Sequence, residues 1–576
     1  MSAEHTFAAT LVDEWARAGL TDAVVAPGSR STPLVAALAA DGRLRLHVVL
    51  DERCAGFVAL GLGLATGRPA PVVVTSGTAA VELHPAVVEA HHAGVPLLVV
   101  SADRPPELHA VGAPQTIAQV GLYGEAVRFA ADPGVASEAM AGAWRSLAAR
   151  SVAETVGNPA GPGTVHLNLR FRDPSVGDAG PLPPGRPQGR PWHAVAGRRA
   201  PAPPPELVRE LAAAAGGDGL VVAGGGGGPA AAELAGALGW PLLADPRSGA
   251  RLAAPWVVAA ADALLRIPEV AAWRPSHVVR VGRPWASKVL AQWLAGIGPD
   301  TVQVLVDPTG AWADPERSAT TVAAADPDLL AAAVRTAAGG PRPPSAWAQR
   351  WAAAEAAAQE AIDACLAAET ALTEPALARA VTAAVPSGGT LVASSSMPVR
   401  DVEWWGRPRD GLAVFANRGA NGIDGVCSTA LGVALGTAAP TVAVVGDLAF
   451  VYDAGALLWA GSRPAELTVV VVDNGGGGIF SFLPQAAAVA PEDFDRLWGT
   501  PHGLDLTALA RAYGVLADRV DDLDALRARV AGPPAGVSVV VAGVADRRAN
   551  VAVHQRLERA VAAAVRPVLA AWPAGC

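Results

Sequence analysis

Short runs of valine and leucine recur along this 576-residue chain, and most of them are followed by a polar turn and then by a helical stretch. Strands that are apolar throughout and separated by helices are typical of a parallel sheet covered by helices on both faces. Ligands bind such sheets beyond the carboxyl ends of the strands, where the polar turns of this chain fall. We therefore expect an α/β fold of doubly wound parallel sheets. The expected strands are residues 23–27, 46–50, 71–75, 95–101, 220–223, 278–281, 302–306, 390–393, 414–416, 442–445, 467–472 and 537–541.

Two stretches rich in proline and glycine divide the chain. Residues 177–205 also carry many arginines, and residues 339–344 precede a long helix that we expect from 345 to about 369. Such stretches are typical of linkers, and a chain of this length is expected to hold about three domains. We predict three α/β domains, at residues 1–180, 181–344 and 345–576.

The composition argues against several classes of protein. The net charge of −9 and the pI near 5.7 do not suit a nucleic-acid-binding protein. No apolar run reaches the roughly 18 residues that a membrane-spanning helix needs. The N-terminus lacks the basic segment and apolar core of a secretory signal. We expect a soluble, cytoplasmic enzyme with no membrane span.

The strongest chemical signal lies in the last third of the chain. Gly446-Asp447-Leu448 follows one expected strand, and Asn474, 27 residues after Asp447, follows the next and precedes four glycines. Because both positions are strand carboxyl ends, a carboxylate and an amide can converge there. Their oxygens suit Mg²⁺, which completes its coordination with phosphate oxygens. The pattern predicts a metal-bridged diphosphate site; the alternative is that Asp447 caps a helix and the glycines form a plain turn.

Three other features are open to two interpretations each. Of the 44 lysine and arginine residues only Lys288 is lysine, either by chance or because a compact ammonium is needed where a planar guanidinium does not serve. The five glycines at 224–228 form either a flexible turn or, with Asp245, a weak dinucleotide-binding signal. Three histidines near one helix end suit packing better than metal binding; they are His84, His91 and His92.

Gly446-Asp447 with Asn474 resembles the diphosphate and metal motif of thiamine-diphosphate (ThDP) enzymes, although these usually have glycine where this chain has Leu448. Six further segments make the chain similar to the MenD family of menaquinone-pathway synthases, whose motif also carries leucine there. The resemblance is dense in the first and third domains and thin in the middle one. The six segments are 26–34 (APGSRSTPL), 51–53 (DER), 75–79 (TSGTA), 102–108 (ADRPPEL), 417–425 (NRGANGIDG) and 479–484 (IFSFLP).

The resemblance implies a transferase that decarboxylates 2-oxoglutarate and adds the succinyl carbanion to isochorismate, giving 2-succinyl-5-enolpyruvyl-6-hydroxy-3-cyclohexene-1-carboxylate and CO₂. It implies ThDP and Mg²⁺ or Mn²⁺ as cofactors, and pyrimidine-binding, central and diphosphate-binding domains in chain order. ThDP is then expected between the first domain of one subunit and the third domain of another. This arrangement requires a homodimer or a dimer of dimers, which is a homotetramer.

The resemblance also implies roles for single residues. Glu52 would be the catalytic carboxyl group, bonded to N1′ of the cofactor pyrimidine so that the imino tautomer takes the thiazolium C2 proton. Ile423 would hold the cofactor in its bent form. Leu448 would contact the cofactor, and the metal ligands would be Asp447, Asn474 and Gly476.

Both implied substrates carry two carboxylates, for which arginine forks are suited. Val289 stands where the family often has an arginine, next to the lone lysine, and Arg283 is a candidate to compensate. The implied substrate-binding residues are Ser29, Arg30, Arg104, Gln115, Lys288, Ser396, Arg400 and Arg418, with Phe480 and Leu483 as apolar walls that exclude water.

Two alternatives stand beside this interpretation. Another ThDP enzyme, such as a 2-oxo acid decarboxylase or an acetolactate-synthase-like ligase, acts on small monoacids and has no need for an array of four arginines. A non-catalytic nucleotide-binding or regulatory protein on the same sheets has no use for a carboxylate at position 52.

Overall fold

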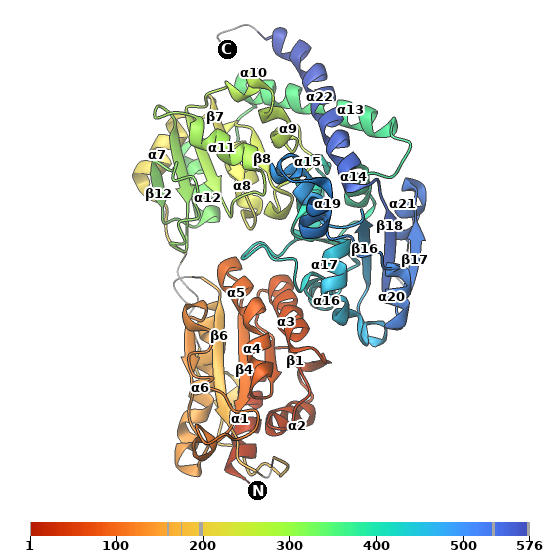
Figure 1. Ribbon diagram of the computed structural model, residues 1–576. Helices are drawn as coiled ribbons and strands as arrows, with labels where there is room; N and C mark the ends of the chain where they lie inside the picture. The colour runs from red at the N-terminus through yellow and green to blue at the C-terminus, as the bar shows by residue number, and fades with distance from the viewer. Residues whose placement is uncertain (1, 158–160, 174, 195–199, 533–535, 573–576) are drawn as a thin grey trace.

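The computed structural model describes residues 2–157, 161–173, 175–194, 200–532 and 536–572. These residues contain three six-stranded sheets in which every strand pair is parallel (Figure 1). The first sheet lies at the bottom of the view, the central sheet at the upper left and the third sheet at the right. The expected fold of three doubly wound parallel-sheet domains is confirmed.

The first sheet has the strand order β2-β1-β3-β4-β6-β5. Apolar residues of α1, α2 and α6 cover one face, and those of α3, α4 and α5 cover the other. The strands are β1 (Asp22–Val25), β2 (Arg45–Val48), β3 (Pro71–Val74), β4 (Leu97–Asp103), β5 (Phe129–Ala131) and β6 (Thr164–Arg170), and the helices are α1 (Ala3–Arg17), α2 (Thr32–Asp41), α3 (Glu52–Thr66), α4 (Thr78–Glu82), α5 (His84–Ala93) and α6 (Ala141–Val156).

The central sheet has the order β12-β11-β10-β7-β8-β9. Helices α7, α8 and α12 cover one face, and α9, α10, α11, α13 and α22 cover the other. The strands are β7 (Gly219–Ala223), β8 (Leu242–Ala244), β9 (Val257–Val258), β10 (His277–Val281), β11 (Val302–Val306) and β12 (Thr321–Ala323), and the helices are α7 (Pro205–Ala213), α8 (Gly228–Leu238), α9 (Ala261–Leu265), α10 (Pro268–Ala271), α11 (Lys288–Gly296), α12 (Pro327–Ala337), α13 (Ala346–Ala367) and α22 (Arg547–Ala570).

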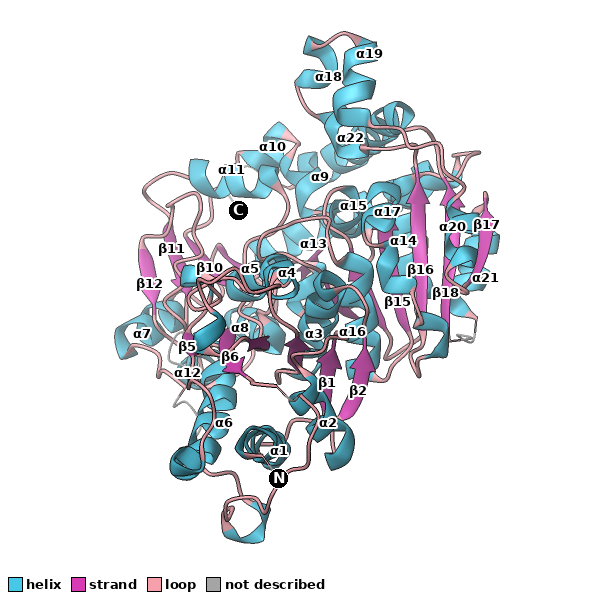
Figure 2. Ribbon diagram, turned by 60° about the horizontal axis from the view of Figure 1, so that its bottom comes forward, coloured by secondary structure: helices cyan, strands magenta, loops and turns pink. Residues whose placement is uncertain are grey.

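The third sheet has the order β14-β13-β15-β16-β18-β17, and Figure 2 shows its strands with helices on either side. Helices α14, α15 and α21 pack on one face, and α16, α17 and α20 on the other. The strands are β13 (Thr390–Ala393), β14 (Ala413–Phe415), β15 (Thr441–Gly446), β16 (Leu467–Asp473), β17 (Leu516–Val520) and β18 (Val537–Gly543), and the helices are α14 (Glu374–Ala384), α15 (Met397–Trp405), α16 (Val426–Thr437), α17 (Asp447–Tyr452), α18 (Gln485–Ala488), α19 (Pro491–Phe494), α20 (Leu506–Ala512) and α21 (Leu523–Ala531).

All twelve expected strands are present, with ends that differ by no more than two residues. The expected long helix is α13, which packs beside α22 on the central sheet through Trp347 and Trp351. Within 177–204, of which 195–199 lie outside the described residues, the secondary structure is one short 3₁₀ helix, Pro187–Gly189. No described helix is both long and apolar enough to span a membrane.

Helices α3 and α16 join the first and third domains through a close backbone approach. A Cβ atom on Gly61 would lie 2.2 Å from the Thr429 carbonyl oxygen, and one on Gly432 would lie 2.1 Å from that of Val58. A side chain at either glycine would push the helices apart. One apolar core therefore runs from the first sheet through these helices to the third sheet, and it fixes where the two domains present their strand ends.

Candidate functional site

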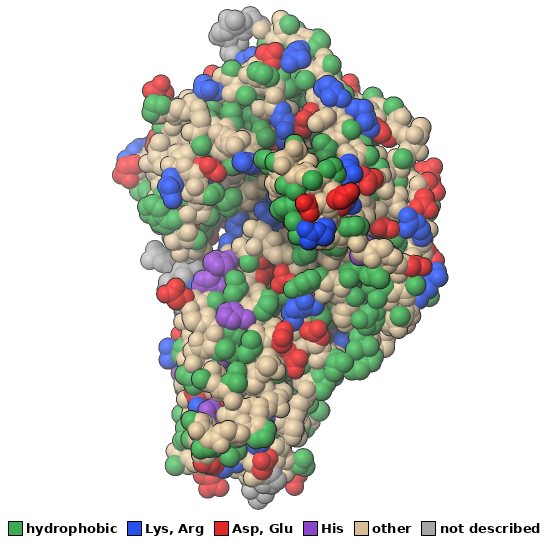
Figure 3. Space-filling model, viewed as in Figure 1, with side chains coloured by type: hydrophobic (Ala, Val, Ile, Leu, Met, Phe, Trp, Pro, Cys, Tyr) green, Lys and Arg blue, Asp and Glu red, His purple; other side chains and the backbone are tan. Residues whose placement is uncertain are grey.

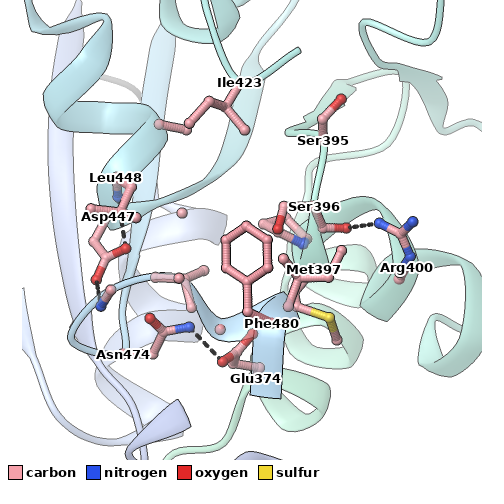
Figure 4. Close-up of a pocket in the computed structure, with 18 of the residues that line it drawn as sticks. Glu374, Ser395, Ser396, Met397, Arg400, Ile423, Asp447, Leu448, Asn474 and Phe480 are labelled. Atoms are coloured by element: carbon pink, nitrogen blue, oxygen red, sulfur yellow. Dashed lines mark hydrogen bonds between the residues drawn. The ribbon is translucent and has the colours of Figure 1, made fainter. Parts of the chain in front are cut away.

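A cavity of about 390 Å³ opens at the carboxyl ends of strands β13, β15 and β16 of the third sheet. Figure 4 shows Asp447 and Leu448 on one side, Ser396 and Arg400 on the other, Phe480 between them and Ile423 at the far end. None of the described residues that line this cavity comes from the first or the central domain. The expected residues that line it are Ser396, Arg400, Arg418, Ile423, Asp447, Leu448, Asn474, Gly476 and Phe480.

Asp447 begins α17 and is almost fully buried. Its Oδ2 accepts a 2.7 Å hydrogen bond from the backbone nitrogen of Gly476, and its Oδ1 accepts one of 2.7 Å from that of Leu448. Burial raises the pKa of Asp447, and these two N–H donors oppose the effect. The carboxylate is thus held at the edge of the cavity beside the glycine loop, as the strand-end argument predicts.

Asn474 provides the second oxygen. Its Nδ2 donates a 2.7 Å hydrogen bond to Oε1 of Glu374, whereas its Oδ1 is buried and has no protein partner. A buried amide oxygen without a partner is costly, and an oxygen of this kind is a ligand that Mg²⁺ prefers. The donor set therefore fits a hard divalent cation.

The glycine loop leaves no room for a side chain at Gly476 or Gly477. Gly476 has a φ of 126°, and a Cβ atom there would lie 2.0 Å from the carbonyl oxygen of Gly499. The backbone of the neighbouring Gly477 donates a 2.7 Å hydrogen bond to the same oxygen. A bare backbone at the cavity edge suits the close approach of a diphosphate.

Two residues near the metal position were missed by sequence reasoning. His502 Nε2 lies 3.5 Å from Asp447 Oδ2, and ligand atoms of Asp447, Asp473 and His502 lie within 4.8 Å of one another. Asp473 also accepts a 2.9 Å hydrogen bond from Arg519. His502 lies in a loop with no motif around it, so nothing in its local sequence marks it. Asp447, Asp473 and His502 form the one group of three possible metal-ligating side chains among the described residues. It contains none of the three histidines of the first domain.

Glu374 was also not predicted. It is the first residue of α14, lies buried in the cavity wall and holds the Asn474 amide. Burial, followed by the neighbouring Asp401, raises the pKa of Glu374 to about 8. In the sequence it looks like an ordinary acidic residue in the first turn of a helix.

The opposite wall of the cavity is cationic. Arg400 Nη1 donates a 2.5 Å hydrogen bond to the carbonyl oxygen of Ser396, which precedes α15 with a φ of 75°. Arg418 Nε is buried without a protein partner. Burial lowers the pKa of both arginines, and the charges of Arg247 and Arg400 lower that of Arg418 further. Two partly desolvated guanidinium groups make this wall suitable for a carboxylate.

Of the three expected apolar positions, two line the cavity and one does not. Ile423 and Phe480 line the cavity, whereas Leu483 is 39% exposed and does not line it in the described part of the chain.

The expected first-domain residues form a second cluster. Arg104 Nη1 donates a 3.0 Å hydrogen bond to Ser76 Oγ, and Gln115 Nε2 donates one of 2.9 Å to the Ser76 carbonyl oxygen. Arg30 donates to the Phe171 carbonyl oxygen at 3.0 Å and to Asp173 at 3.1 Å. Burial, and then the charge of Arg30, lower the pKa of Arg104. Ser29 precedes Arg30 in the turn between β1 and α2, so these residues gather where strands of the first sheet end.

Glu52 is the first residue of α3, directly after the capping residue Asp51, and is half-buried. Burial raises the pKa of Glu52, and the nearby carboxylates of Asp51 and Glu82 add to the effect. It does not line the cavity that holds Asp447. A single chain therefore keeps the two parts of the expected cofactor site apart.

Lys288 begins α11 and is exposed at a separate cavity of about 220 Å³ in the central domain. Val289 packs against the apolar core. Arg283 lines that cavity and also a larger cleft of about 720 Å³, shared with Arg418, between the central and first domains. Figure 3 shows this cleft as a hollow with histidine and other basic side chains near its rim.

The five glycines at 224–228 form a turn packed against the backbone at the end of β10. A Cβ atom on Gly224 would lie 1.6 Å from the Arg283 carbonyl oxygen. Asp245, the acidic partner that a dinucleotide site would need, accepts hydrogen bonds from Arg247 instead. The close backbone packing explains the glycines, and the structure favours a plain turn over a dinucleotide-binding loop.

Comparisons with known proteins agree with this geometry. The family described as "Thiamine pyrophosphate enzyme, N-terminal TPP binding domain" matches residues 5–122, "Middle domain of thiamine pyrophosphate" matches 188–392, and "Thiamine pyrophosphate enzyme, C-terminal TPP binding domain" matches 407–541. The fold is similar to that of a benzoylformate decarboxylase from Polynucleobacter necessarius, with a TM-score of 0.71 and 18% identity over 94% of this chain and 98% of that one.

Curated relatives match over almost the whole length. A 2-succinyl-5-enolpyruvyl-6-hydroxy-3-cyclohexene-1-carboxylate synthase of Thermobifida fusca (strain YX) is 45% identical over 98% of this chain and 100% of its own. Synthases of the same name from Kineococcus radiotolerans and Myxococcus xanthus are 44% and 42% identical, over 99% and 97% of this chain and 100% and 97% of their own.

Proposed function

This chain belongs to the family of 2-succinyl-5-enolpyruvyl-6-hydroxy-3-cyclohexene-1-carboxylate synthases, and from that premise we propose how its own residues share the reaction. It is a ThDP-dependent carboligase of menaquinone biosynthesis. It is a transferase that decarboxylates 2-oxoglutarate and adds the succinyl group to isochorismate, releasing CO₂.

The glycine-loop side of the cavity would hold the diphosphate and its metal. Asp447 Oδ, Asn474 Oδ1 and the backbone of Gly476 are the proposed ligands of Mg²⁺ or Mn²⁺, and Leu448 and Ile423 would contact the cofactor. When bound, ThDP supplies the carbanion that attacks the substrate carbonyl. The unpartnered oxygen of Asn474, facing a cavity that also holds Asp447, is the observation that carries this assignment.

Glu52 is the proposed catalytic carboxyl group. Its role is to share a proton with N1′ of the pyrimidine ring. Burial beside Asp51 and Glu82 favours the protonated form, which suits a group that must donate a hydrogen bond to a ring nitrogen.

The cations bind and orient the two anionic substrates. Arg400, Arg418 and Ser396 would meet carboxylates at the third-domain cavity, and Arg30, Arg104, Gln115 and Ser29 would do so from the first domain. Phe480 would exclude water from the reacting atoms. Lys288 and Leu483 are proposed to complete the substrate site from its rim.

The site is proposed to be completed by a second copy of the chain. Glu52 lies apart from the Asp447 cavity, and exposed apolar side chains surround its helix start, with Leu50 at 53% and Val48 at 44% exposure. Apolar surface of this kind suits burial in an interface. We therefore propose a homodimer or a dimer of dimers with active sites between subunits, working in the cytoplasm.

The test is an assay with 2-oxoglutarate and isochorismate, with and without ThDP. CO₂ release should require ThDP, and product formation should require isochorismate. The Asp447→Ala variant should lose ThDP and metal binding together, whereas Asp493→Ala, which alters an exposed carboxylate, should bind both normally. Preference for pyruvate over 2-oxoglutarate would point to another ThDP enzyme instead.

A further inference from the structure

A chain of buried polar side chains runs from the metal position into the third domain. It begins at Asn474 Nδ2, which donates to Glu374 Oε1 at 2.7 Å, and continues to the neighbouring carboxyl group of Asp401. His554 Nε2 lies 3.1 Å from Asp401 Oδ1. All four side chains are more than nine-tenths buried and come from four separate elements, β16 with its loop, α14, α15 and α22.

The far end of this chain fixes which ring nitrogen of His554 carries the proton. Trp405 Nε1 donates to His554 Nδ1 at 3.3 Å, and an indole nitrogen can only donate. Nδ1 is therefore the acceptor, so the neutral ring carries its proton on Nε2, which faces Asp401.

Glu374 lies at the near end of this chain and sets the direction of the Asn474 amide. Oε1 of Glu374 is left as an acceptor, and the partner it accepts from is the Asn474 amide nitrogen. The amide oxygen must then point the other way, toward the cavity, where it has no protein partner.

We propose that Glu374 is a positioning residue of the metal site that fixes the Asn474 side chain with its oxygen toward the cation. The proposal rests on the metal role of Asn474 given above. The two ends of an amide have nearly the same shape, so packing alone does not choose between them. An amide nitrogen pointing at the cation could not bind it. Partners that orient metal ligands typically contribute about 10–100-fold to metal affinity.

The test measures Mn²⁺ affinity of the full-length protein with ThDP present, from the electron paramagnetic resonance signal of free Mn²⁺. Glu374→Met keeps the length of the side chain but offers Asn474 no comparable acceptor, and should weaken Mn²⁺ binding about tenfold or more. Glu374→Gln should stay within about threefold, because the amide oxygen of glutamine can accept from Asn474 as Oε1 of glutamate does. Equal losses in both variants would overturn the proposal.

Glu355→Met is the matched control. Glu355 is as buried as Glu374 but accepts from the Ala260 backbone and Gln359, away from the cavity. It should lower thermal stability and leave Mn²⁺ affinity unchanged. If it weakened Mn²⁺ binding as much as Glu374→Met, a general loss of packing would explain both and the proposal would be wrong.

Two more variants separate this proposal from the one it rests on. Asn474→Ala should itself weaken Mn²⁺ binding; if it does not, the metal assignment fails. In Glu374→Met/Asn474→Asp either carboxylate oxygen can face the cation, so affinity should recover relative to Glu374→Met. If Asn474→Ala weakens binding but Glu374→Met does not, the metal site stands and the positioning role is wrong. Where Glu374→Met fails to fold by circular dichroism, Glu374→Leu takes its place with the same expected loss.

Discussion

The carboxylate of Glu89 on α5 of the first domain accepts a 2.6 Å hydrogen bond from the backbone nitrogen of Gly419 in the third domain. Its other oxygen accepts one of 2.6 Å from the next residue, Ala420. Glu89 is buried, and a Cβ atom on Gly419 would lie 2.4 Å from the Glu89 carbonyl oxygen. The segment that carries Arg418 is thus fastened to the neighbouring domain just beyond the cavity.

Glu89→Ala should therefore affect substrate binding more than cofactor binding. Two charge-assisted bonds of about 1.5–3 kcal/mol each are lost, and Arg418 is no longer held in place. We expect KM for 2-oxoglutarate or isochorismate to rise about tenfold, by the 1.4 kcal/mol equivalence, with ThDP affinity little changed. Glu89→Gln keeps one acceptor oxygen, so its KM should lie between those of the wild type and Glu89→Ala. A lower Tm with an unchanged KM would mean that Glu89 only supports the fold.

Glu52→Gln should separate cofactor binding from proton transfer. Glutamine keeps the shape of the side chain but removes the proton that the carboxyl group shares with the pyrimidine, so kcat should fall about 10²–10⁴-fold while ThDP still binds. The direct measurement is deuterium exchange at the thiazolium C2 position, followed by NMR, which should slow in parallel. Glu82→Gln, a change in a neighbouring carboxylate, is the control. Undiminished exchange in Glu52→Gln would contradict the catalytic role.

Asp453 should make stability depend on pH. It is fully buried between the first and third domains, accepts from the backbone nitrogen and hydroxyl of Ser428, and receives the Cys54 thiol at 3.4 Å. Burial raises the pKa of Asp453 from 3.8 to about 6. The folded state then binds the proton more tightly than the unfolded state, so this contribution to stability is present below about pH 4 and is lost as the pH rises to about 6.

The Asp453→Asn variant removes that titration while keeping an oxygen for Ser428. The wild-type advantage in unfolding free energy should fall by roughly 2 kcal/mol between pH 4 and pH 6 and stay constant above pH 7. Denaturant unfolding of both proteins across this range measures it. A difference that does not change with pH would show that Asp453 keeps its ordinary pKa.

The pairing of Asp447 with Asn474 was predictable from sequence because it depends only on local pattern. Each follows an apolar strand, and β15 and β16 are neighbours in register, so residues just beyond their ends meet. Glu374 and His502 reach the same cavity because distant segments of the chain pack together, and no local sequence pattern predicts such packing. Strand β6 was not predicted from the sequence for a similar reason. His166 and Asn168 interrupt its apolar pattern, but both are buried because Ser101 on the neighbouring strand β4 forms hydrogen bonds with them.

Variants of Lys288 test whether this one lysine binds substrate. A substrate-binding lysine and a solvated surface lysine predict different effects of substitution on KM. If its ammonium meets a substrate carboxylate, Lys288→Arg should raise KM for isochorismate about tenfold, because a planar fork does not replace a compact charge at a shaped site. Lys288→Ala should be worse, and Arg283→Ala should also raise KM, since Arg283 lines both the cavity beside Lys288 and the cleft that Arg418 reaches. Arg274→Ala, in the same domain, removes a guanidinium that donates to the nearby Ala271 and Trp273 carbonyl oxygens, and it is the control. Steady-state kinetics that are identical for Lys288→Arg and wild type would mean that the ammonium is a solvated surface charge.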